Sequence, residues 1–185
     1  MNLANTITLT RIIFTPIFLI GLFYYSPDRP FFYNVSVVIF FVVCLSDALD
    51  GYVARRLNAC TVVGSYIDPI ADKLLLLTGF GALTFMAHLP EAMRIPVWLT
   101  VIVIARDVII LLGSAVIFLV KGKLKVEPSK IGKLTTVMQM ATVGAALLQV
   151  SSPAETILFI STALVTVLSG LLYVRGGRRT LEEVS

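Results

Sequence analysis

Long apolar stretches alternate along this chain with short polar ones. Six stretches reach or approach the length of about 20 residues that a helix needs to cross the hydrocarbon core of a membrane. They cover residues 12–25, 31–49, 67–87, 95–120, 131–150 and 154–174. The polar run at residues 5–11 predicts an N-terminal segment that lies at the membrane interface. The pattern therefore predicts an all-α integral membrane protein with six transmembrane helices.

The composition agrees with this class. Hydrophobic residues make up 57% of the 185 residues and charged residues 14%, and the mean hydropathy is +0.93. A soluble domain carries about 25% charged residues. The sequence shows no internal repeat and no low-complexity stretch. We therefore expect a single membrane domain over residues 1–185, with a tail at residues 175–185.

The basic residues predict an orientation. If the N-terminus is cytoplasmic, all but three of the 15 Lys and Arg residues fall on the cytoplasmic side, the exceptions being Arg29, Arg94 and Arg106. Cytoplasmic loops carry an excess of positive charge, so we expect both termini in the cytoplasm. The net charge of +4 then reflects this rule and an attraction to anionic membrane lipids. It does not indicate a nucleic-acid partner.

Four carboxylates lie at helical spacing near the ends of two successive apolar stretches: Asp47, Asp50, Asp68 and Asp72. The members of each pair are three or four residues apart, so each pair shares one face of a helix. Pro69 suits the first turn of the second helix. Oxygen ligands without histidine or cysteine favour Mg²⁺, Mn²⁺ or Ca²⁺ over zinc. A metal site at a membrane face indicates a phosphorylated lipid substrate, because two such ions can clamp the oxygens of a phosphoryl transfer.

On spacing alone, the carboxylates are also compatible with two different roles. The basic side chains of Arg55 and Lys73 could balance them in a salt-bridge network without metal. A cation transporter could also use carboxylates to bind and pass ions, but the inverted repeats or broken helices typical of that class are not evident in this sequence.

The four aspartates belong to a longer pattern, D-x2-D-G-x2-A-R-x8-G-x3-D-x3-D. The pattern is complete at Asp47, Asp50, Gly51, Ala54, Arg55, Gly64, Asp68 and Asp72. In this the chain resembles the CDP-alcohol phosphotransferases, also called CDP-alcohol phosphatidyltransferases. Residues 5–11 and 68–73 resemble the N-x-x-T-x-x-R and D-P-x-A-D-K runs of the bacterial members that transfer phosphatidyl groups. The resemblance covers nearly the whole chain.

The resemblance implies a reaction. Members of the family transfer a phosphatidyl group, or a simpler phosphoalcohol, from a CDP-linked donor to an alcohol and release CMP. The donor expected here is CDP-diacylglycerol. Members depend on Mg²⁺ or Mn²⁺, here expected as two ions, and are commonly homodimers. The expected location is a bacterial inner membrane, with the active site facing the cytoplasm.

The resemblance also implies roles for the pattern residues. Metal is expected at Asp47, Asp50 and Asp68, with Asp72 at the second ion. Asp72 is also the expected general base, which takes the proton from the acceptor hydroxyl before that hydroxyl attacks the β-phosphorus of the donor. The CDP part of the donor is expected to contact Gly51, Ala54, Arg55 and Gly64.

Two acceptor alcohols are the main candidates, and an inositol phosphate is a third with less support. Residues 132–136 resemble the G-K-x-K-T region of bacterial phosphatidylglycerophosphate synthases, whose acceptor is sn-glycerol 3-phosphate, and this acceptor is our leading expectation. Thr135 departs from that pattern, which has lysine there. Residues 106–108 and 173–178 look like those of the CMP-forming cardiolipin synthases, whose acceptor is phosphatidylglycerol.

Three basic residues are candidates for binding the acceptor: Arg106, Lys130 and Lys133. A guanidinium suits the geometry of a phosphate, and the two lysines stand three residues apart at the start of a predicted helix. Arg106 could instead form a self-neutralising pair with Asp107. The lysines could equally be an ordinary basic flank of a membrane helix.

Overall fold

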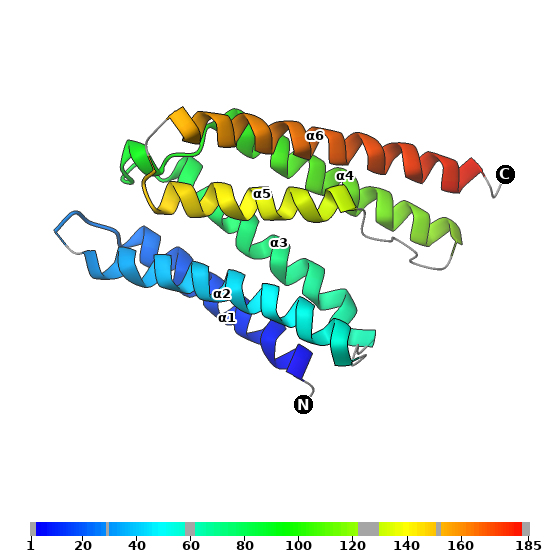
Figure 1. Ribbon diagram of the computed structural model, residues 1–185, viewed down its shortest axis with the longest axis horizontal. Coiled ribbons are helices and arrows are strands. Elements are labelled where there is room, and N and C mark those ends of the chain that lie inside the picture. Colours follow the sequence, from blue (N-terminus) through cyan, green and yellow to red (C-terminus); the bar gives the residue numbers. More distant parts are fainter. Residues whose placement is uncertain (1–2, 29, 58–61, 122–129, 151–152, 183–185) are drawn as a thin grey trace. The chain divides into compact units, whose positions relative to one another are not determined.

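The computed structural model describes residues 3–28, 30–57, 62–121, 130–150 and 153–182 (Figure 1). Within these ranges, some side chains lie outside the description: those of residues 3–11, 47–57, 62–72, 118, 120, 121, 130 and 178–182.

The described residues form six α-helices and one short 3-10 helix, with no β-strand among them. The helices are α1 (Leu3–Phe23), α2 (Pro30–Leu57), α3 (Val62–Phe85), η1 (Glu91–Met93), α4 (Val97–Lys121), α5 (Lys130–Leu147) and α6 (Pro153–Glu182). Each of the six apolar stretches overlaps one α-helix, which confirms the all-α prediction. Helix α1 already begins before the polar run at residues 5–11, and α6 continues through most of the predicted tail.

The chain forms two compact units. The first consists of residues 1–95 together with residues 143–150, and the second of residues 96–142 together with residues 151–185. Helix α5 contributes to both, because its first part belongs to the second unit and its C-terminal end to the first.

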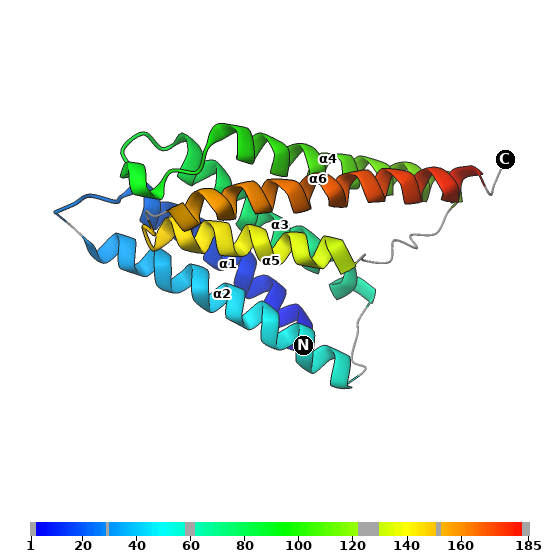
Figure 2. The same ribbon diagram turned by 45° about the horizontal axis from the view of Figure 1, so that its top comes forward.

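In the first unit, α1 packs against both α2 and α3 (Figures 1 and 2). Phe18 of α1, Phe40 of α2 and Leu83 of α3 are almost completely buried. The ring centroids of Phe18 and Phe40 are 5.9 Å apart, within the range of favourable aromatic pairs. The end of α5 is held to α2 because the Tyr33 hydroxyl donates to the Leu147 carbonyl oxygen over 2.6 Å.

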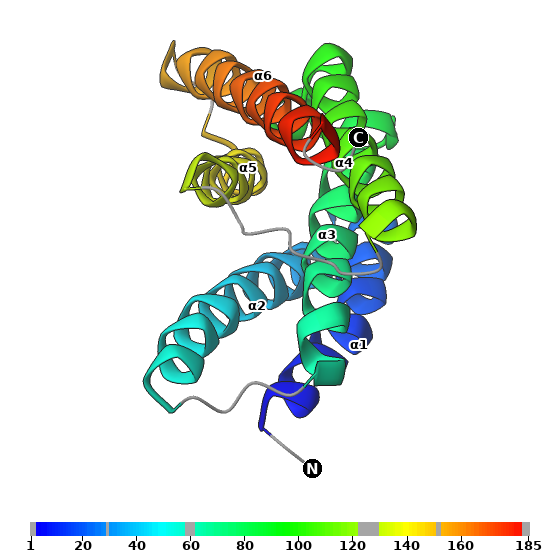
Figure 3. The same ribbon diagram turned by 90° about the vertical axis from the view of Figure 1, so that its right-hand side faces the viewer.

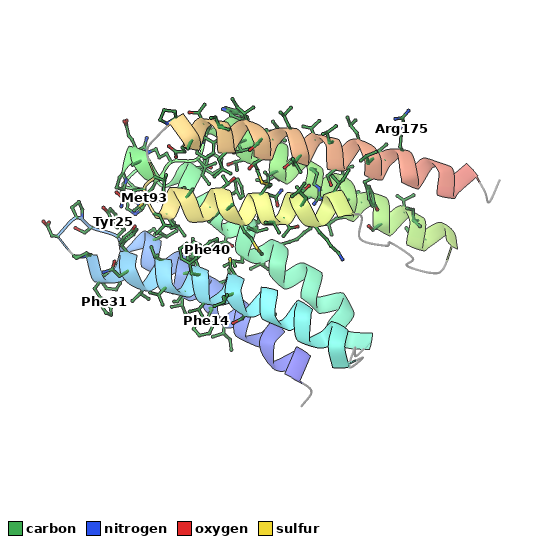
Figure 4. All side chains as sticks on the ribbon, viewed as in Figure 1. Phe14, Tyr25, Phe31, Phe40, Met93 and Arg175 are labelled. Atoms are coloured by element: carbon green, nitrogen blue, oxygen red, sulfur yellow. The ribbon has the colours of Figure 1, made fainter. Side chains whose placement is uncertain are left out.

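One end of the first unit is rich in aromatic side chains. Tyr25 follows α1 and Phe31 is the second residue of α2, and Figure 4 shows both at this end, near Met93 of η1. Phe23 packs edge-to-face against His88, with ring centroids 6.2 Å apart. Aromatic residues are enriched where a membrane meets water, so this end has the composition of an interfacial belt.

Helices α1 and α2 approach closely at a glycine. A Cβ atom on Gly21 would overlap the Ser36 Oγ and would lie 3.0 Å from the Phe32 carbonyl oxygen. The Ser36 hydroxyl is also hydrogen-bonded at this point, to the carbonyl oxygens of Phe18 and Phe32, both at 3.1 Å. A small residue therefore allows a polar contact between two apolar helices.

In the second unit, α4 packs along α6 (Figures 1 and 3). Their approach again depends on a glycine, because a Cβ atom on Gly113 would lie 2.8 Å from the Tyr173 ring. The hydroxyls of Ser114 and Tyr173 are hydrogen-bonded beside it, at 2.8 Å. Helix α5 joins α6 through the hydroxyls of Thr142 and Thr162, which are 2.9 Å apart.

The second unit buries polar side chains and exposes apolar ones. The buried polar residues are Thr100, Arg106, Thr135, Gln139, Thr142, Thr162, Thr166 and Ser169. Large apolar side chains that are exposed on α4 and α6 include Leu112, Leu119, Ile157 and Leu171. This arrangement suits hydrocarbon surroundings better than water. Two stretches of the described chain, Glu91–Ile117 and Pro153–Gly177, are long and apolar enough to cross a membrane, with mean hydropathies of 2.3 and 2.2.

The contact at Gly21 makes a testable prediction. Gly21→Ala should lower the free energy of unfolding by about 1–3 kcal/mol, because the added methyl group has to displace Ser36 or separate the helices. The measurement is thermal unfolding of the detergent-solubilised protein.

Gly81→Ala is the matched control for Gly21→Ala. Apart from its chain neighbours and the backbone of its own helix turns, no described atom lies within 4 Å of the position that its Cβ would take. Alanine is the better helix former by about 1 kcal/mol, so this variant should be as stable as the parent or more stable. Equal stabilities for the two variants would show that the α1–α2 contact tolerates a methyl group.

Candidate active site

The two aspartate pairs lie on α2 and α3. Asp47 and Asp50 belong to the C-terminal part of α2, and Asp68 and Asp72 to the first half of α3. Their side chains lie outside the description, as do those of the other pattern residues between 47 and 72. The backbone is helical through both pairs, so the spacing places the members of each pair on one helix face.

The two pairs lie at similar distances in sequence from the connection between α2 and α3. Helix α2 ends at Leu57 and α3 begins at Val62, so their Cα atoms are at most about 19 Å apart at 3.8 Å per residue step. Asp47 lies 10 residues before Leu57, and Asp72 lies 10 residues after Val62. Carboxylates offer oxygen donors only, and such donors fit a hard divalent cation.

Pro69 lies inside α3, and its predicted place in the first turn is wrong. The apolar run begins at Ile67, but the helix begins earlier, at Val62. A proline inside a helix has no N–H for the carbonyl oxygen four residues before it, which here belongs to Ser65. That oxygen lacks its regular intrahelical donor, one turn from Asp68.

Arg106 is buried on α4, with 8% of its surface exposed. Its Nη1 donates to Oδ1 of Asp107 over 2.8 Å, and its Nη2 donates to Oγ of Ser169 on α6 over 2.7 Å. Its Nε is buried and has no hydrogen-bond partner in the described part of the chain. The pair with Asp107 is therefore present, and the Nε atom of the guanidinium is the nitrogen without a partner.

The two candidate lysines begin α5. The Lys130 side chain lies outside the description, and the Lys133 side chain is exposed. Thr135 is buried, and its hydroxyl donates to the Val165 carbonyl oxygen of α6 over 3.4 Å. Residues two apart on a helix point in nearly opposite directions, so Lys133 lies on a different side of α5 from its contact with α6. Among the described contacts, none joins Lys133 to Arg106.

A family model, CDP-alcohol phosphatidyltransferase, matches residues 1–168 of this sequence. The chain belongs to the CDP-alcohol phosphatidyltransferase family. The match includes both aspartate pairs and the three basic candidates. This family is generally metal-dependent, and carboxylate oxygens are ligands that a divalent metal ion accepts.

Curated relatives carry two kinds of name. A probable phosphatidylglycerophosphate synthase of Mycobacterium tuberculosis is 33% identical, over 97% of this chain and 83% of its own length. A CDP-diacylglycerol–glycerol-3-phosphate 3-phosphatidyltransferase of Bacillus subtilis is 31% identical, over 93% of each chain. The CMP-forming cardiolipin synthase of Homo sapiens is 29% identical, over 99% of this chain and 64% of its own length.

Sequence reasoning missed a set of buried polar residues in this phosphatidyltransferase. Thr162, Thr166 and Ser169 recur along α6 at intervals of four and three residues, and all are buried. Thr135, Gln139 and Thr142 repeat this arrangement on α5 and are also buried. Such polar stripes within apolar helices are readable in the sequence and indicate a face that packs on another helix.

The bond between Arg106 and Ser169 makes a second prediction. Ser169→Ala leaves the Arg106 Nη2 buried without a partner, so the free energy of unfolding should fall by about 1–3 kcal/mol. Thermal unfolding in detergent measures this loss.

Ser161→Ala is the control on the same helix. The Ser161 hydroxyl donates to the Leu158 carbonyl oxygen of its own helix, at 2.9 Å, and supports no charged group. Its loss should change the stability by no more than about 0.5 kcal/mol. If the two variants were equally stable, Ser169 would not be holding Arg106.

Proposed function

We propose that this phosphatidyltransferase moves the phosphatidyl group of CDP-diacylglycerol to sn-glycerol 3-phosphate, giving phosphatidylglycerophosphate and CMP in phospholipid synthesis. The observation that carries the proposal is the family match, which includes both aspartate pairs on α2 and α3. Relatives that resemble the chain over most of its length, and that are named for this activity, support the choice of acceptor.

The donor and the metal are assigned to the first unit. Asp47, Asp50 and Asp68 hold Mg²⁺ or Mn²⁺, with Asp72 at a second ion. Bound metal would neutralise the charge that develops on the departing CMP. The CDP moiety contacts Gly51, Ala54, Arg55 and Gly64. Glycine allows the nucleotide to approach the helix backbone, and Arg55 provides a positive charge for the pyrophosphate.

Asp72 acts as the general base. Its carboxylate accepts the proton of the acceptor hydroxyl, and the oxygen so activated forms a bond to the β-phosphorus of the donor. The bond between this phosphorus and the bridging oxygen breaks, and that oxygen leaves with CMP.

The acceptor is assigned to residues of α4 and α5. Arg106 has one donor atom without a partner, Nε, which suits an oxygen of the acceptor phosphate. Lys130 and Lys133 add positive charge at the start of α5 and attract the phosphate before it binds.

The proposed setting is a bacterial inner membrane. The chain crosses it six times as a single domain, residues 1–185, with both termini and the active site on the cytoplasmic side. The distribution of basic residues supports this orientation. A homodimer is proposed because members of the family are commonly homodimers.

A second candidate acceptor is phosphatidylglycerol, which would make the protein a CMP-forming cardiolipin synthase. The similarity to the human enzyme of that name and the Arg106–Asp107 pair favour it.

The decisive assay is CMP release by the purified protein in detergent, with CDP-diacylglycerol and Mg²⁺. Glycerol 3-phosphate and phosphatidylglycerol are offered separately. We expect release with glycerol 3-phosphate, its loss on chelation with EDTA, and its return with Mg²⁺ or Mn²⁺. Release with phosphatidylglycerol alone would establish the cardiolipin synthase instead. No release with any alcohol acceptor would reopen the transporter hypothesis.

Asp72→Asn tests the general base. The amide keeps the shape of the side chain but cannot take a proton, so turnover should fall by about 10²–10⁴-fold. Binding of CDP-diacylglycerol, measured by equilibrium titration, should remain detectable.

Asp28→Asn is the matched control for Asp72→Asn. Asp28 lies between α1 and α2 and is exposed, and its substitution should leave turnover unchanged. Normal turnover in Asp72→Asn would exclude Asp72 as the base. A matching loss of donor affinity would assign it to binding instead.

A further inference from the structure

Three buried side-chain nitrogen and oxygen atoms in the described part of the chain have no hydrogen-bond partner. They are the Arg106 Nε, the Gln139 Nε2 and the Thr166 Oγ1, and all three belong to the second unit. Their residues are 8%, 1% and 0% exposed. Buried polar groups in proteins almost always have a partner, so each exception needs a physical reason.

The contacts around these atoms bring them together. Arg106 is bonded to Ser169, and Thr166 lies three residues before Ser169 on α6, about 4.5 Å along the helix axis. Gln139 lies on the same face of α5 as Thr135 and Thr142. These two residues contact α6 on either side of it, at Val165 and Thr162 respectively. Gln139 therefore lies on the side of α5 that faces residues 162–165 of α6, and Thr166 is the next residue along α6.

The Thr166 hydroxyl is unusual among the threonines of this unit. Thr135, Thr136 and Thr142 each donate to the carbonyl oxygen four residues earlier in their own helix, at 2.8, 3.3 and 2.9 Å. This local bond is the usual way for a helical threonine to satisfy its hydroxyl. Thr166 does not form it, so its hydroxyl remains available to another group.

The chemistry of the cluster favours an uncharged hydroxyl ligand beside a phosphate. Of these three residues, Arg106 alone is charged, and it is paired with Asp107. Gln139 and Thr166 are neutral, so these two side chains suit an uncharged group rather than an anion. An amide and a hydroxyl each donate and accept hydrogen bonds, and the hydroxyl of an alcohol does the same. The 2-hydroxyl of a glycerol phosphate stands on the carbon next to the one that bears the phosphate ester.

We propose that Gln139 and Thr166 bind the non-reacting 2-hydroxyl of the acceptor's glycerol unit while Arg106 Nε holds its phosphate. The inference rests on the proposed function and adds the residues that select the acceptor. A glycerol unit with this hydroxyl is present both in glycerol 3-phosphate and in the headgroup of phosphatidylglycerol, so the same residues would serve either acceptor.

The test compares each acceptor with the analogue that lacks the 2-hydroxyl. The pairs are glycerol 3-phosphate with 3-hydroxypropyl phosphate, and phosphatidylglycerol with phosphatidylpropane-1,3-diol. For the acceptor that the wild type uses, we expect kcat/KM to exceed that of its analogue at least about tenfold, since a site built to bond a hydroxyl rejects a ligand without it. Gln139→Leu and Thr166→Val should each lower kcat/KM for the glycerol acceptor about tenfold, and should change it for the analogue less than about threefold.

Thr142→Val is the matched control. The Thr142 hydroxyl is buried on the same face of α5 but is already bonded to Thr162 and to the Met138 carbonyl oxygen. This variant should lose stability and keep the preference for the glycerol acceptor. Thr166→Val removes an unpaired hydroxyl without changing the side-chain shape, so it should fold at least as well as the parent.

The outcomes separate this inference from the proposed function. Release of CMP with an unchanged preference in both variants would overturn the hydroxyl site and would leave the activity standing. It would then assign the Gln139 Nε2 and the Thr166 Oγ1 to an internal water. A wild type that releases no CMP with either glycerol acceptor would overturn both proposals.

Discussion

Apolar surroundings make an unpaired polar group costly, and the packing of the second unit follows from this constraint. An arginine in the middle of a membrane helix costs about 2.5–3.5 kcal/mol on insertion scales. Arg106 offsets that cost with Asp107 beside it and Ser169 on α6. The bond to Ser169 requires the two helices to approach closely, which the absence of a side chain permits at Gly113. The same constraint pairs Ser114 with Tyr173, so polar contacts and small residues together determine how α4 meets α6.

The helices themselves could be predicted from the sequence because in hydrocarbon a helix satisfies its own backbone groups. A long apolar run therefore leaves little alternative to a helix, and each of the six runs overlaps one. The ends were less predictable. Apolar character marks the part of a helix that can lie in lipid, while the backbone continues into polar sequence. For this reason α3 begins before Ile67, Pro69 falls inside it, and α6 continues to Glu182.

Part of the candidate site could be predicted from the sequence, and part of it could not. The aspartate pairs could be recognised because their spacing is local, and the helical backbone of α2 and α3 preserves it. The partner of Arg106 could not, since Ser169 is 63 residues away in sequence and the two meet only when α4 packs on α6. The stripe of Thr162, Thr166 and Ser169 shows that α6 has a polar face. It does not reveal which residue on another helix that face would meet.

The two groups of polar residues suit different parts of one reaction. Four aspartates close together in the sequence would repel one another without a cation. With a bound cation they suit the phosphoryl-transfer step, in which negative charge develops on the departing CMP. Gln139 and Thr166 are neutral, and they can be buried in apolar helices at much lower cost. A hydrogen bond formed there does not compete with water, so it discriminates more sharply between an alcohol with a hydroxyl and one without. The charged residues therefore fit the chemistry that members of the family share. The neutral residues suit the selection of the acceptor. The relatives of this chain have names that differ in the acceptor.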